Sequence, residues 1–305
     1  MTESRYDGTG GNSPQWWPSR HGADDRLGSG NELTPERTLA ALSLPKTGRV
    51  IELTRVIDPG IPIYPPRYWN QLILGHESLE GLRPEDSESD FGAFEEVIAQ
   101  SYQVGCHLDA LGHVTIDGRF YNGVHYRDNF TPAGMREMGI DNAKPWVTRG
   151  VCLDIEAVVG LDALVGGFVI EPDHLDAACL RQGVEVRPGD ALLIHTGWGR
   201  FWGADNDRYA TSEPGLGWDA AHWVTERHIS LIGADTWAVE VVPFENPRRP
   251  FVVHQHFIPE SGVHILENAD TSALASGGFS EFLFILSPVK TAGSTASMVS
   301  PLAIV

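Results

Sequence analysis

The segment SYQVGCHLDALGHVTIDGRFYNG, residues 101–123, contains side chains that can coordinate a metal ion or move a proton. His107 and Asp109 are two residues apart, so an extended strand would place both on one face, whereas a helix would place them on nearly opposite sides. Gln103 has the same parity as this pair, and His113 follows one short turn later. We therefore expect Gln103, His107 and Asp109 to converge on one point of an extended chain.

Imidazole nitrogens and carboxylate oxygens are ligands for zinc, manganese and iron(II), while an amide oxygen is a weaker, neutral ligand that suits harder ions. Such a set would leave open positions for water and substrate. The alternative is that His107 and Asp109 form a buried hydrogen-bonded pair and that His113 is an exposed loop residue. Four polar residues within eleven positions count against this alternative, because each would need its own buried partner. The spacing alone leaves both interpretations open.

The composition restricts the class of partner. The chain has 305 residues, 42% of them hydrophobic, with nine tryptophans, which is enough for a full core. Acidic residues outnumber basic ones 41 to 22, so the formal net charge is −19. This charge would repel nucleic-acid phosphates and anionic lipid surfaces. We expect a small-molecule substrate, with neither a nucleic acid nor a membrane as partner.

The cysteines and the hydrophobic runs indicate the compartment. Cys106, Cys152 and Cys179 are odd in number and have no C-x-x-C spacing, so neither a disulfide framework nor a thiolate zinc site is predicted. The first thirty residues lack an apolar signal region, and no apolar run approaches the roughly 20 residues that a membrane helix needs. These observations predict a cytoplasmic protein.

The order of the predicted elements indicates the fold class. Residues 1–32 are rich in Gly, Ser and Asp and predict an irregular N-terminal arm, followed by a catalytic body over residues 33–305. LTPERTLAALSL predicts a helix that begins after a Thr34 cap. GRVIELTRVI alternates as a strand, and GVCLDIEAVVG (150–160) predicts a buried strand leading into a loop. Helices then alternate with strands, so we predict an α/β fold, a mixed β/α single domain with an N-terminal arm.

The segment QVGCHLDALGH, residues 103–113, resembles the H-x-G-T-H-x-D-x-x-x-H signature of the metal-dependent cyclase family. That family includes bacterial kynurenine formamidases and isatin hydrolases. The similarity extends to GADDRLGSGNELTP in the arm and to the ending SPVKTAGSTASMVSPLAIV. The resemblance implies the swivelling β/β/α fold of the family. It also implies a homodimer or homotetramer with exchanged segments, which the arm suits.

The resemblance also implies roles for individual residues. His107 and Asp109 match metal ligands, and His113 matches the histidine that handles protons at the attacking water. Two positions depart from the pattern: Gln103 stands where the family has its first histidine ligand, and Cys106 where it has threonine. Gln103 can still coordinate through its amide oxygen, but it should weaken zinc binding and favour manganese, or leave the site partly empty. We expect Cys106 to pack in the core.

Family members with two metals add a late histidine and a glutamate, which here fall in HQHFIPESGVHILEN, residues 254–268. His254 and Glu267 match these two ligands. Their separation is one residue longer than expected, so His256 remains an alternative to His254. Glu267 closes the apolar run VHIL, and a carboxylate there needs a cation, a donor or water. His195, by contrast, is predicted to be structural.

Together these features predict a metal-dependent hydrolase that opens an amide, formamide, lactam or lactone of a small cyclic or aromatic substrate with a metal-activated water. The cofactor would be one or two Mn²⁺ or Zn²⁺ ions. The expected metal ligands are Gln103, His107, Asp109, His254 and Glu267, with His113 as the catalytic acid and base. Two alternatives stay open: a lyase, isomerase or cyclase that acts on a carbonyl compound, and a binding protein in which Gln103 marks a degenerate metal site.

Overall fold

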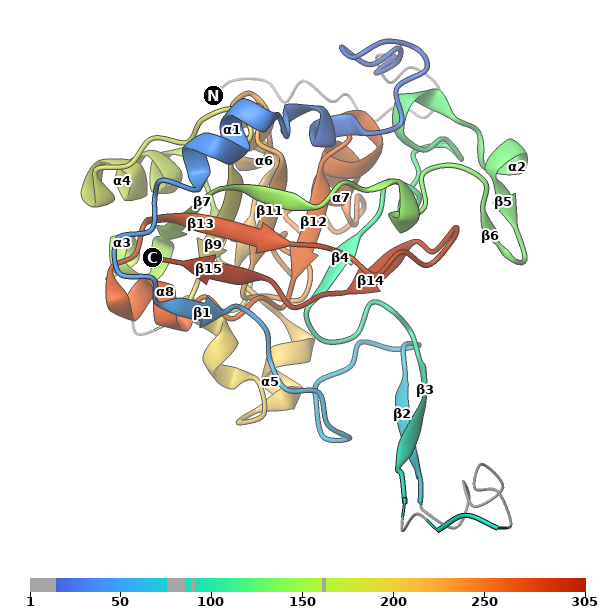
Figure 1. Ribbon diagram of the computed structural model, residues 1–305. Helices are drawn as coiled ribbons and strands as arrows, with labels where there is room; N and C mark the ends of the chain where they lie inside the picture. Colours follow the sequence, from blue (N-terminus) through green and yellow to red (C-terminus); the bar gives the residue numbers. More distant parts are fainter. Residues whose placement is uncertain (1–14, 76–85, 89–90, 161–162) are drawn as a thin grey trace.

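A nine-stranded mixed sheet forms the centre of the protein (Figure 1). The computed structural model describes residues 15–75, 86–88, 91–160 and 163–305, so the first 14 residues of the predicted arm lie outside the described residues. In spatial order the strands of the sheet are β1 (Val50–Glu52), β15 (Leu302–Ile304), β13 (Glu281–Leu286), β7 (Trp146–Asp154), β9 (Ala191–His195), β11 (Leu231–Ala234), β12 (His264–Glu267), β4 (His107–Asp109) and β14 (Ala296–Met298).

The four middle strands β7, β9, β11 and β12 are parallel to one another, and antiparallel strands flank them on both sides. Within the described residues, three further two-stranded pairs are β8 (Val169–Ile170) with β10 (Gly215–Leu216), β2 (Trp69–Leu74) with β3 (Glu95–Gln100), and β5 (Phe130–Thr131) with β6 (Gly134–Met135). The helices are α1 (Pro35–Ala41), α2 (Tyr126–Asn129), α3 (Ile155–Val159), α4 (Pro172–Gln182), α5 (Asn206–Thr211), α6 (Trp218–Thr225), α7 (Val252–Gln255) and α8 (Ser272–Gly277). The predicted α/β class is confirmed as a mixed α/β fold, while the finer description as a swivelling β/β/α domain stays a prediction.

Alternate residues of the middle strands enter two different cores, as the period of a strand requires. Ile194 on β9 lies in a core that also holds the apolar faces of α4 and α6. Leu193, one residue earlier, lies in a second core on the other face of the sheet, together with Phe282 of β13 and Leu274 of α8. A polar residue at the end of a strand therefore emerges on one face or the other according to its parity.

Two local predictions are confirmed and one is wrong. The helix α1 begins after Thr34, whose hydroxyl accepts a hydrogen bond from the Arg37 main-chain N–H at 3.4 Å. GVCLDIEAVVG forms the end of β7 as predicted, but its second half is the helix α3 and not a loop. Asp154 caps this helix by accepting a hydrogen bond from the Ala157 N–H at 2.9 Å. The interpretation as a strand and loop followed the apolar residues and overlooked this N-cap aspartate.

The described part of the N-terminal arm lies against the body and contains one 3₁₀ turn, Gly28–Glu32. The Ser29 hydroxyl donates to the main-chain oxygen of Ser230 at 2.8 Å. The Tyr121 hydroxyl donates to Asp25 at 2.6 Å. The boundary between arm and body at residue 32 stays a prediction.

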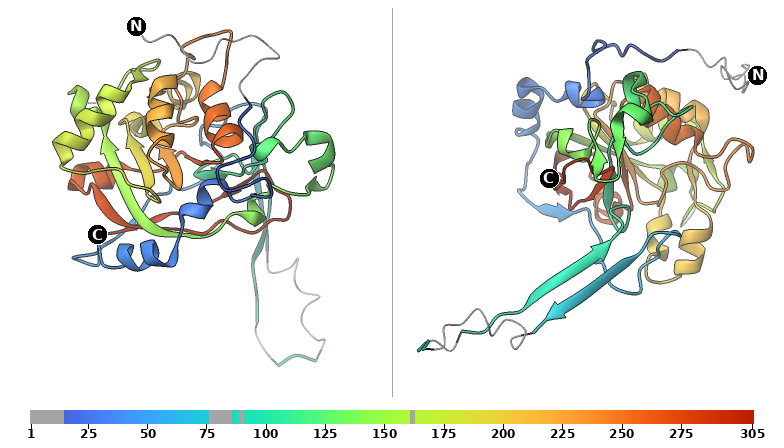
Figure 2. Two further views of the ribbon diagram at one scale, coloured as in Figure 1. Left: turned by 90° about the horizontal axis from the view of Figure 1, so that it is seen from above. Right: turned by 90° about the vertical axis from the view of Figure 1, so that its right-hand side faces the viewer.

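The hairpin of β2 and β3 extends away from the body (Figures 1 and 2). On one of its faces Leu72 and Val97 are directly opposite each other and are 58% and 53% exposed. Ile73 and Ile98 are also exposed, on the other face. Among the described residues, no helix is long and apolar enough to cross a membrane.

We expect Gly150→Ala to destabilise the sheet. Gly150 on β7 is opposite Phe282 on β13, and a Cβ atom at position 150 would lie 2.1 Å from Cε2 of the Phe282 ring, which is fully buried. Overpacking of this kind should lower the free energy of unfolding by about 1–3 kcal/mol, measured by urea denaturation. The matched control is Gly30→Ala, whose Cβ would find no atom outside its immediate chain neighbours nearer than Cβ of Leu27 at 3.8 Å. If Phe282→Leu fails to recover part of the loss in Gly150→Ala, the ring is not the cause.

His264 should make the stability depend on pH. Its ring is buried on β12, where Nδ1–H donates to the main-chain oxygen of Asp109 at 2.8 Å, and burial lowers the pKa of His264 to about 4. Between pH 6.5 and 4 the unfolded chain binds a proton that the folded protein does not, so the free energy of unfolding should fall as the pH falls, by on the order of 3 kcal/mol. His264→Asn keeps a donor near the Nδ1 position and does not titrate. Urea denaturation at both pH values should give a smaller fall for this variant, and equal falls would contradict the assignment.

Candidate metal centre

A buried cluster of three polar side chains lies where β4 pairs with β12. His107 is directly opposite Glu267 in this antiparallel pair, and Asp109 is on the same face of β4 two residues on. The side chains of His107, Glu267 and Asp109 are 0%, 2% and 1% exposed, respectively. One ligand atom from each lies within 4.8 Å of the others. Nε2 of His107 is 3.0 Å from Glu267 Oε2 and 3.8 Å from Asp109 Oδ1.

The cluster contains buried polar atoms that form no hydrogen bond with the described residues. These atoms are Nε2 of His107, both carboxylate oxygens of Asp109 and Oε2 of Glu267, and of these Nε2 of His107 and Oε2 of Glu267 face each other as an ion pair at 3.0 Å. Nδ1–H of His107 donates to the main-chain oxygen of Gly105 at 2.9 Å, which turns Nε2 toward the two carboxylates. Buried polar atoms of this kind are costly unless a partner satisfies them, and a divalent cation would satisfy all four. The residues therefore fit a metal ion.

His254 joins the cluster from α7, and His256 does not. Nε2 of His254 is 3.1 Å from Glu267 Oε1, while its Nδ1 is 2.9 Å from Glu240 Oε2. The nitrogens of His256 instead contact Glu260 and the hydroxyl of Thr225. Of the two predicted alternatives, the structure brings His254 to Glu267. Glu240, which no motif in the sequence marks, is the carboxylate that orients His254.

The electrostatics of the cluster follow from this packing. Burial alone would lower the pKa of His107 and His254, but the carboxylates around them raise it, to about 10 for His254. Burial alone would raise the pKa of Glu267, but the two adjacent histidines lower it below its ordinary value. The carboxylate is therefore ionised near neutral pH, as a metal ligand must be.

Gln103 does not lie on the strand that holds His107, so the predicted continuous strand is wrong at this end. Gly105 has a φ of +66°, and the chain bends from residue 102 to residue 106 before β4 begins at His107. The Gln103 side chain nevertheless returns to the site. Its Nε2 is 3.3 Å from Nδ1 of His113 and 3.2 Å from the Thr295 hydroxyl. Cys106 is buried in the core as predicted.

His113 connects the cluster to a cavity of about 460 Å³. Its Nε2 is 3.7 Å from Asp109 Oδ2, and its ring is 24% exposed. Burial lowers the pKa of His113, with the charge of Asp109 opposing that shift. The other residues that line the cavity are Arg67, Gln103, Gly112, Thr115, Phe120, Tyr126, Phe130, Met135 and Thr295.

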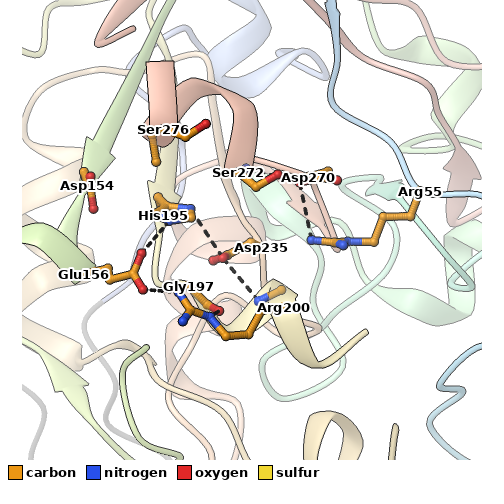
Figure 3. Close-up of a pocket in the computed structure, with 12 residues that line it drawn as sticks. Arg55, Asp154, Glu156, His195, Gly197, Arg200, Asp235, Asp270, Ser272 and Ser276 are labelled. Carbon is orange, nitrogen blue, oxygen red and sulfur yellow. Dashed lines mark hydrogen bonds and ion pairs between the residues drawn. The ribbon is translucent and has the colours of Figure 1, made fainter. Parts of the chain in front are cut away.

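A second cluster of possible ligands lies at the carboxyl ends of β7 and β9 (Figure 3). Asp154 is paired with His195 in the parallel register, and Glu156 follows in α3. Here the polar atoms have partners. Glu156 pairs with Arg200 and with Nε2 of His195 at 3.0 Å, while Nδ1 of His195 is 2.7 Å from the Thr271 hydroxyl. These contacts fit the structural role predicted for His195.

The second cluster lines a cavity of about 410 Å³, which Asp235 also borders. Asp235, just beyond the end of β11, holds the backbone that follows β9. Its Oδ1 accepts hydrogen bonds from the main-chain N–H and the hydroxyl of Thr196, at 2.9 and 2.7 Å. Its Oδ2 accepts a hydrogen bond from Gly199 N–H at 3.3 Å. Nothing in the sequence indicated that Asp154 and Glu156 would meet His195.

Comparisons with solved structures agree with this fold. A structure described as a novel cyclase is 29% identical, with 93% of this chain and 95% of that chain covered and a TM-score of 0.83. Isatin hydrolase A from Ralstonia solanacearum is 20% identical over 84% of this chain and 91% of its own, with a TM-score of 0.63. A potential metal-dependent hydrolase with cyclase activity is 16% identical over 84% and 98%, with a TM-score of 0.52.

The family assignment rests on the sequence itself. No curated protein matches the chain in sequence. The sequence model of the family described as "Putative cyclase" matches residues 51–241, which is more than half of the chain and includes β4 and the first half of the candidate metal centre. The resemblance drawn from residues 103–113 is thereby confirmed, and the protein belongs to the cyclase family.

Proposed function

We propose that the protein is a metal-dependent hydrolase that opens an amide, formamide, lactam or lactone bond of a small cyclic or aromatic substrate. The observation that carries this proposal is the buried cluster of His107, Asp109 and Glu267, in which four buried polar atoms form no hydrogen bond within the described chain. A likeness in fold to isatin hydrolase A supports the same reaction class.

The proposed ligands are His107, Asp109 and Glu267, with His254 held against Glu267 by Glu240. A second ion would use His254 and Oε1 of Glu267, the carboxylate oxygen nearest to His254. Manganese suits this set better than zinc, because two of the three clustered ligands are carboxylates. Gln103 stays outside the proposed set, since its amide nitrogen contacts His113 and Thr295.

The mechanism needs few other groups. When bound, the metal would polarise the substrate carbonyl and lower the pKa of a water molecule. His113 exchanges protons through Nε2, the ring nitrogen nearest Asp109. Arg67 lies at the same cavity with its side chain 23% exposed and its Nη1 4.0 Å from Glu267 Oε2, so its charge faces the reacting end of a substrate.

The cavity wall supports an aromatic substrate. Phe120, Tyr126, Phe130 and Met135 line it and present flat or polarisable surfaces. A ring would pack against these side chains with its scissile carbonyl toward His113. Isatin, N-formylkynurenine and simple lactones are therefore the substrates to test first. Product mass separates the alternatives, because hydrolysis adds one water whereas isomerisation leaves the mass unchanged.

Asp109→Asn should abolish metal binding. The substitution keeps the shape of the side chain but removes the charge that a cation requires, so Mn²⁺ affinity should fall by more than the roughly 10–100-fold that loss of an outer-shell partner causes. Titration calorimetry of the metal-free protein measures the affinity, and turnover of the substrates above should be lost in parallel. The matched control is Asp154→Asn in the second cluster, which should leave Mn²⁺ stoichiometry unchanged.

Two outcomes would contradict the proposed function. One is less than a tenth of an equivalent of Mn²⁺ or Zn²⁺ in the wild-type protein after reconstitution. The other is full turnover in Asp109→Asn or His107→Ala. Tight binding of an unchanged organic ligand without metal would favour the binding-protein alternative.

We further propose that the protein assembles as a homodimer or homotetramer through the β2–β3 hairpin. A two-stranded hairpin has little stability alone in water, and this one exposes Leu72, Val97, Ile73 and Ile98 on its two faces. A second copy of the chain would cover these side chains.

Leu72→Glu combined with Val97→Lys should dissociate this assembly. The pair is directly opposite across the hairpin, so the new charges can pair with each other and preserve the hairpin while opposing its burial. Light scattering should report a smaller mass for the double variant than for the wild type. Leu180→Glu on α4, which changes a side chain that is 85% exposed, is the control and should leave the mass unchanged. A monomeric wild-type protein would refute the assembly.

A further inference from the structure

Three arginines line one cavity beside the substrate cavity, which is the cavity of about 460 Å³ at the candidate metal centre. They are Arg26, Arg119 and Arg136, and we call their cavity the arginine cavity. It measures about 390 Å³, within the roughly 300–1,000 Å³ of small-molecule sites. Two carboxylates, Asp128 and Glu137, also line it. In a chain whose formal net charge is −19, the cavity is a local excess of positive charge.

Two of these arginines have no carboxylate partner. Nε of Arg26 forms an ion pair with Glu137. Arg119 and Arg136, by contrast, form no ion pair with any residue that the structure describes. An oxyanion in the cavity would therefore meet two guanidinium groups that no described carboxylate neutralises.

The guanidinium group of Arg119 is held in place. Its Nη1 donates to the main-chain oxygen of Gly123 at 2.9 Å, and its central carbon lies 5.1 Å from the ring centroid of Trp17 in the N-terminal arm. The backbone of Arg119 is bonded to Ile116 through both its N–H and its oxygen, at 2.9 Å each. The remaining N–H groups of the planar fork are thus pre-organised, so that binding an oxyanion with two parallel hydrogen bonds would cost little side-chain entropy.

A buried side-chain amide also lines the arginine cavity. Asn129 is 1% exposed, and its Oδ1 accepts a hydrogen bond from the main-chain N–H of Glu137 at 2.7 Å. Its Nδ2 is buried and forms no hydrogen bond within the described residues. Buried amide donors ordinarily have a partner. An oxygen atom of a bound anion would supply one.

One segment of the chain forms a wall of both cavities. This segment runs from α2 through β5 and β6 to Arg136, at one side of the body (Figure 1). Asn129 and Arg136 line the arginine cavity, and they are joined by a hydrogen bond of 2.9 Å between the Arg136 N–H and the Asn129 main-chain oxygen. The substrate cavity is lined from the same segment by Tyr126, Phe130 and Met135.

We propose that the arginine cavity binds a small oxyanion with two negative charges, a phosphate or a dicarboxylate, through Arg119, Arg136 and Asn129. The bound anion clamps the segment that ends at Arg136 to the part of the body that holds Arg119. Because the anion contacts both sides, it stabilises the clamped arrangement by its difference in affinity for the clamped and open forms. The consequence for substrate rests on the proposed function, which assigns the substrate to the neighbouring cavity.

The first test is calorimetric titration of the metal-free protein with inorganic phosphate and with succinate. At least one of the two anions should bind with one equivalent, and the pair distinguishes a phosphate ligand from a carboxylate ligand. In Arg136→Gln and in Arg119→Gln the affinity should fall about tenfold or more, because each variant loses a hydrogen bond between charged groups. Arg136 is exposed, so its replacement should leave the fold intact.

The matched control is Arg67→Gln, which removes the same charge from the substrate cavity and should leave the anion affinity unchanged. No saturable binding of either anion up to about 10 mM would overturn the proposal. A loss of binding in Arg67→Gln, with none in Arg119→Gln or Arg136→Gln, would place the anion in the substrate cavity and overturn it as well.

The second test follows the shared wall. Hydrogen exchange of the main-chain amides in residues 126–135 should slow when the anion is bound to the wild type, because the clamped segment opens less often. In Arg136→Gln the same concentration of anion should leave the exchange unchanged. Anion binding to the wild type without slower exchange in this segment would refute the clamp.

The outcome of both tests is independent of the proposed function, because neither needs metal or substrate. In an active enzyme, the anion should lower the KM of the wild type and leave that of Arg136→Gln unchanged. A protein that hydrolyses none of the substrates would refute the hydrolase proposal and leave the anion site intact. An active enzyme whose anion affinity is the same in Arg119→Gln and Arg136→Gln as in the wild type would keep the hydrolase proposal and refute the anion site.

Discussion

The antiparallel pairing of β4 with β12 is the constraint on which the candidate site depends. It places His107 opposite Glu267, although 159 positions separate them in the sequence, and holds both at 2% exposure or less. Main-chain hydrogen bonds fix the register, so the side chains cannot move apart to find water. Two ionisable groups and Asp109 thus remain buried together. Burying these groups together costs stability unless their charges are balanced within the cluster. A bound cation would balance the carboxylates, so the same geometry suits a cation site.

The loop from Asp235 to Glu240 supports the cluster through Glu240, which contacts His254. Buried Glu213 accepts hydrogen bonds from the main-chain N–H groups of Trp237 and Ala238, at 2.6 and 2.8 Å. This support holds Val239 at a φ of 62°, a conformation that a β-branched residue rarely adopts. The next residue, Glu240, then reaches His254. The backbone strain therefore lies beside the carboxylate that orients a proposed ligand, where surrounding contacts over-determine the chain.

The sequence predicted the part of the site that depends on local periodicity. His107 and Asp109 share a face because a strand has a period of two, and that parity was readable. Gln103 shared it only while the strand was continuous, and Gly105 with its positive φ ends that continuity. The choice between His254 and His256 depends on the rotation of α7 against β12. Tertiary packing sets this rotation, so the spacing of His254, His256 and Glu267 in the sequence does not predict it.

The two carboxylate–histidine clusters show why position in the fold does not define a metal site by itself. Both lie at the carboxyl ends of parallel strands, where α/β sheets bind ligands. Glu267 and His195 emerge on opposite faces, since Glu267 has the parity of Ile265 in one core and His195 that of Leu193 in the other. Around His195, an arginine and a hydroxyl satisfy the polar groups. Around Glu267 several polar atoms lack such partners. What distinguishes a metal centre from a salt-bridge cluster is therefore the presence of buried polar atoms that form no hydrogen bond. The position in the fold, the burial and the residue types do not tell the two kinds of cluster apart.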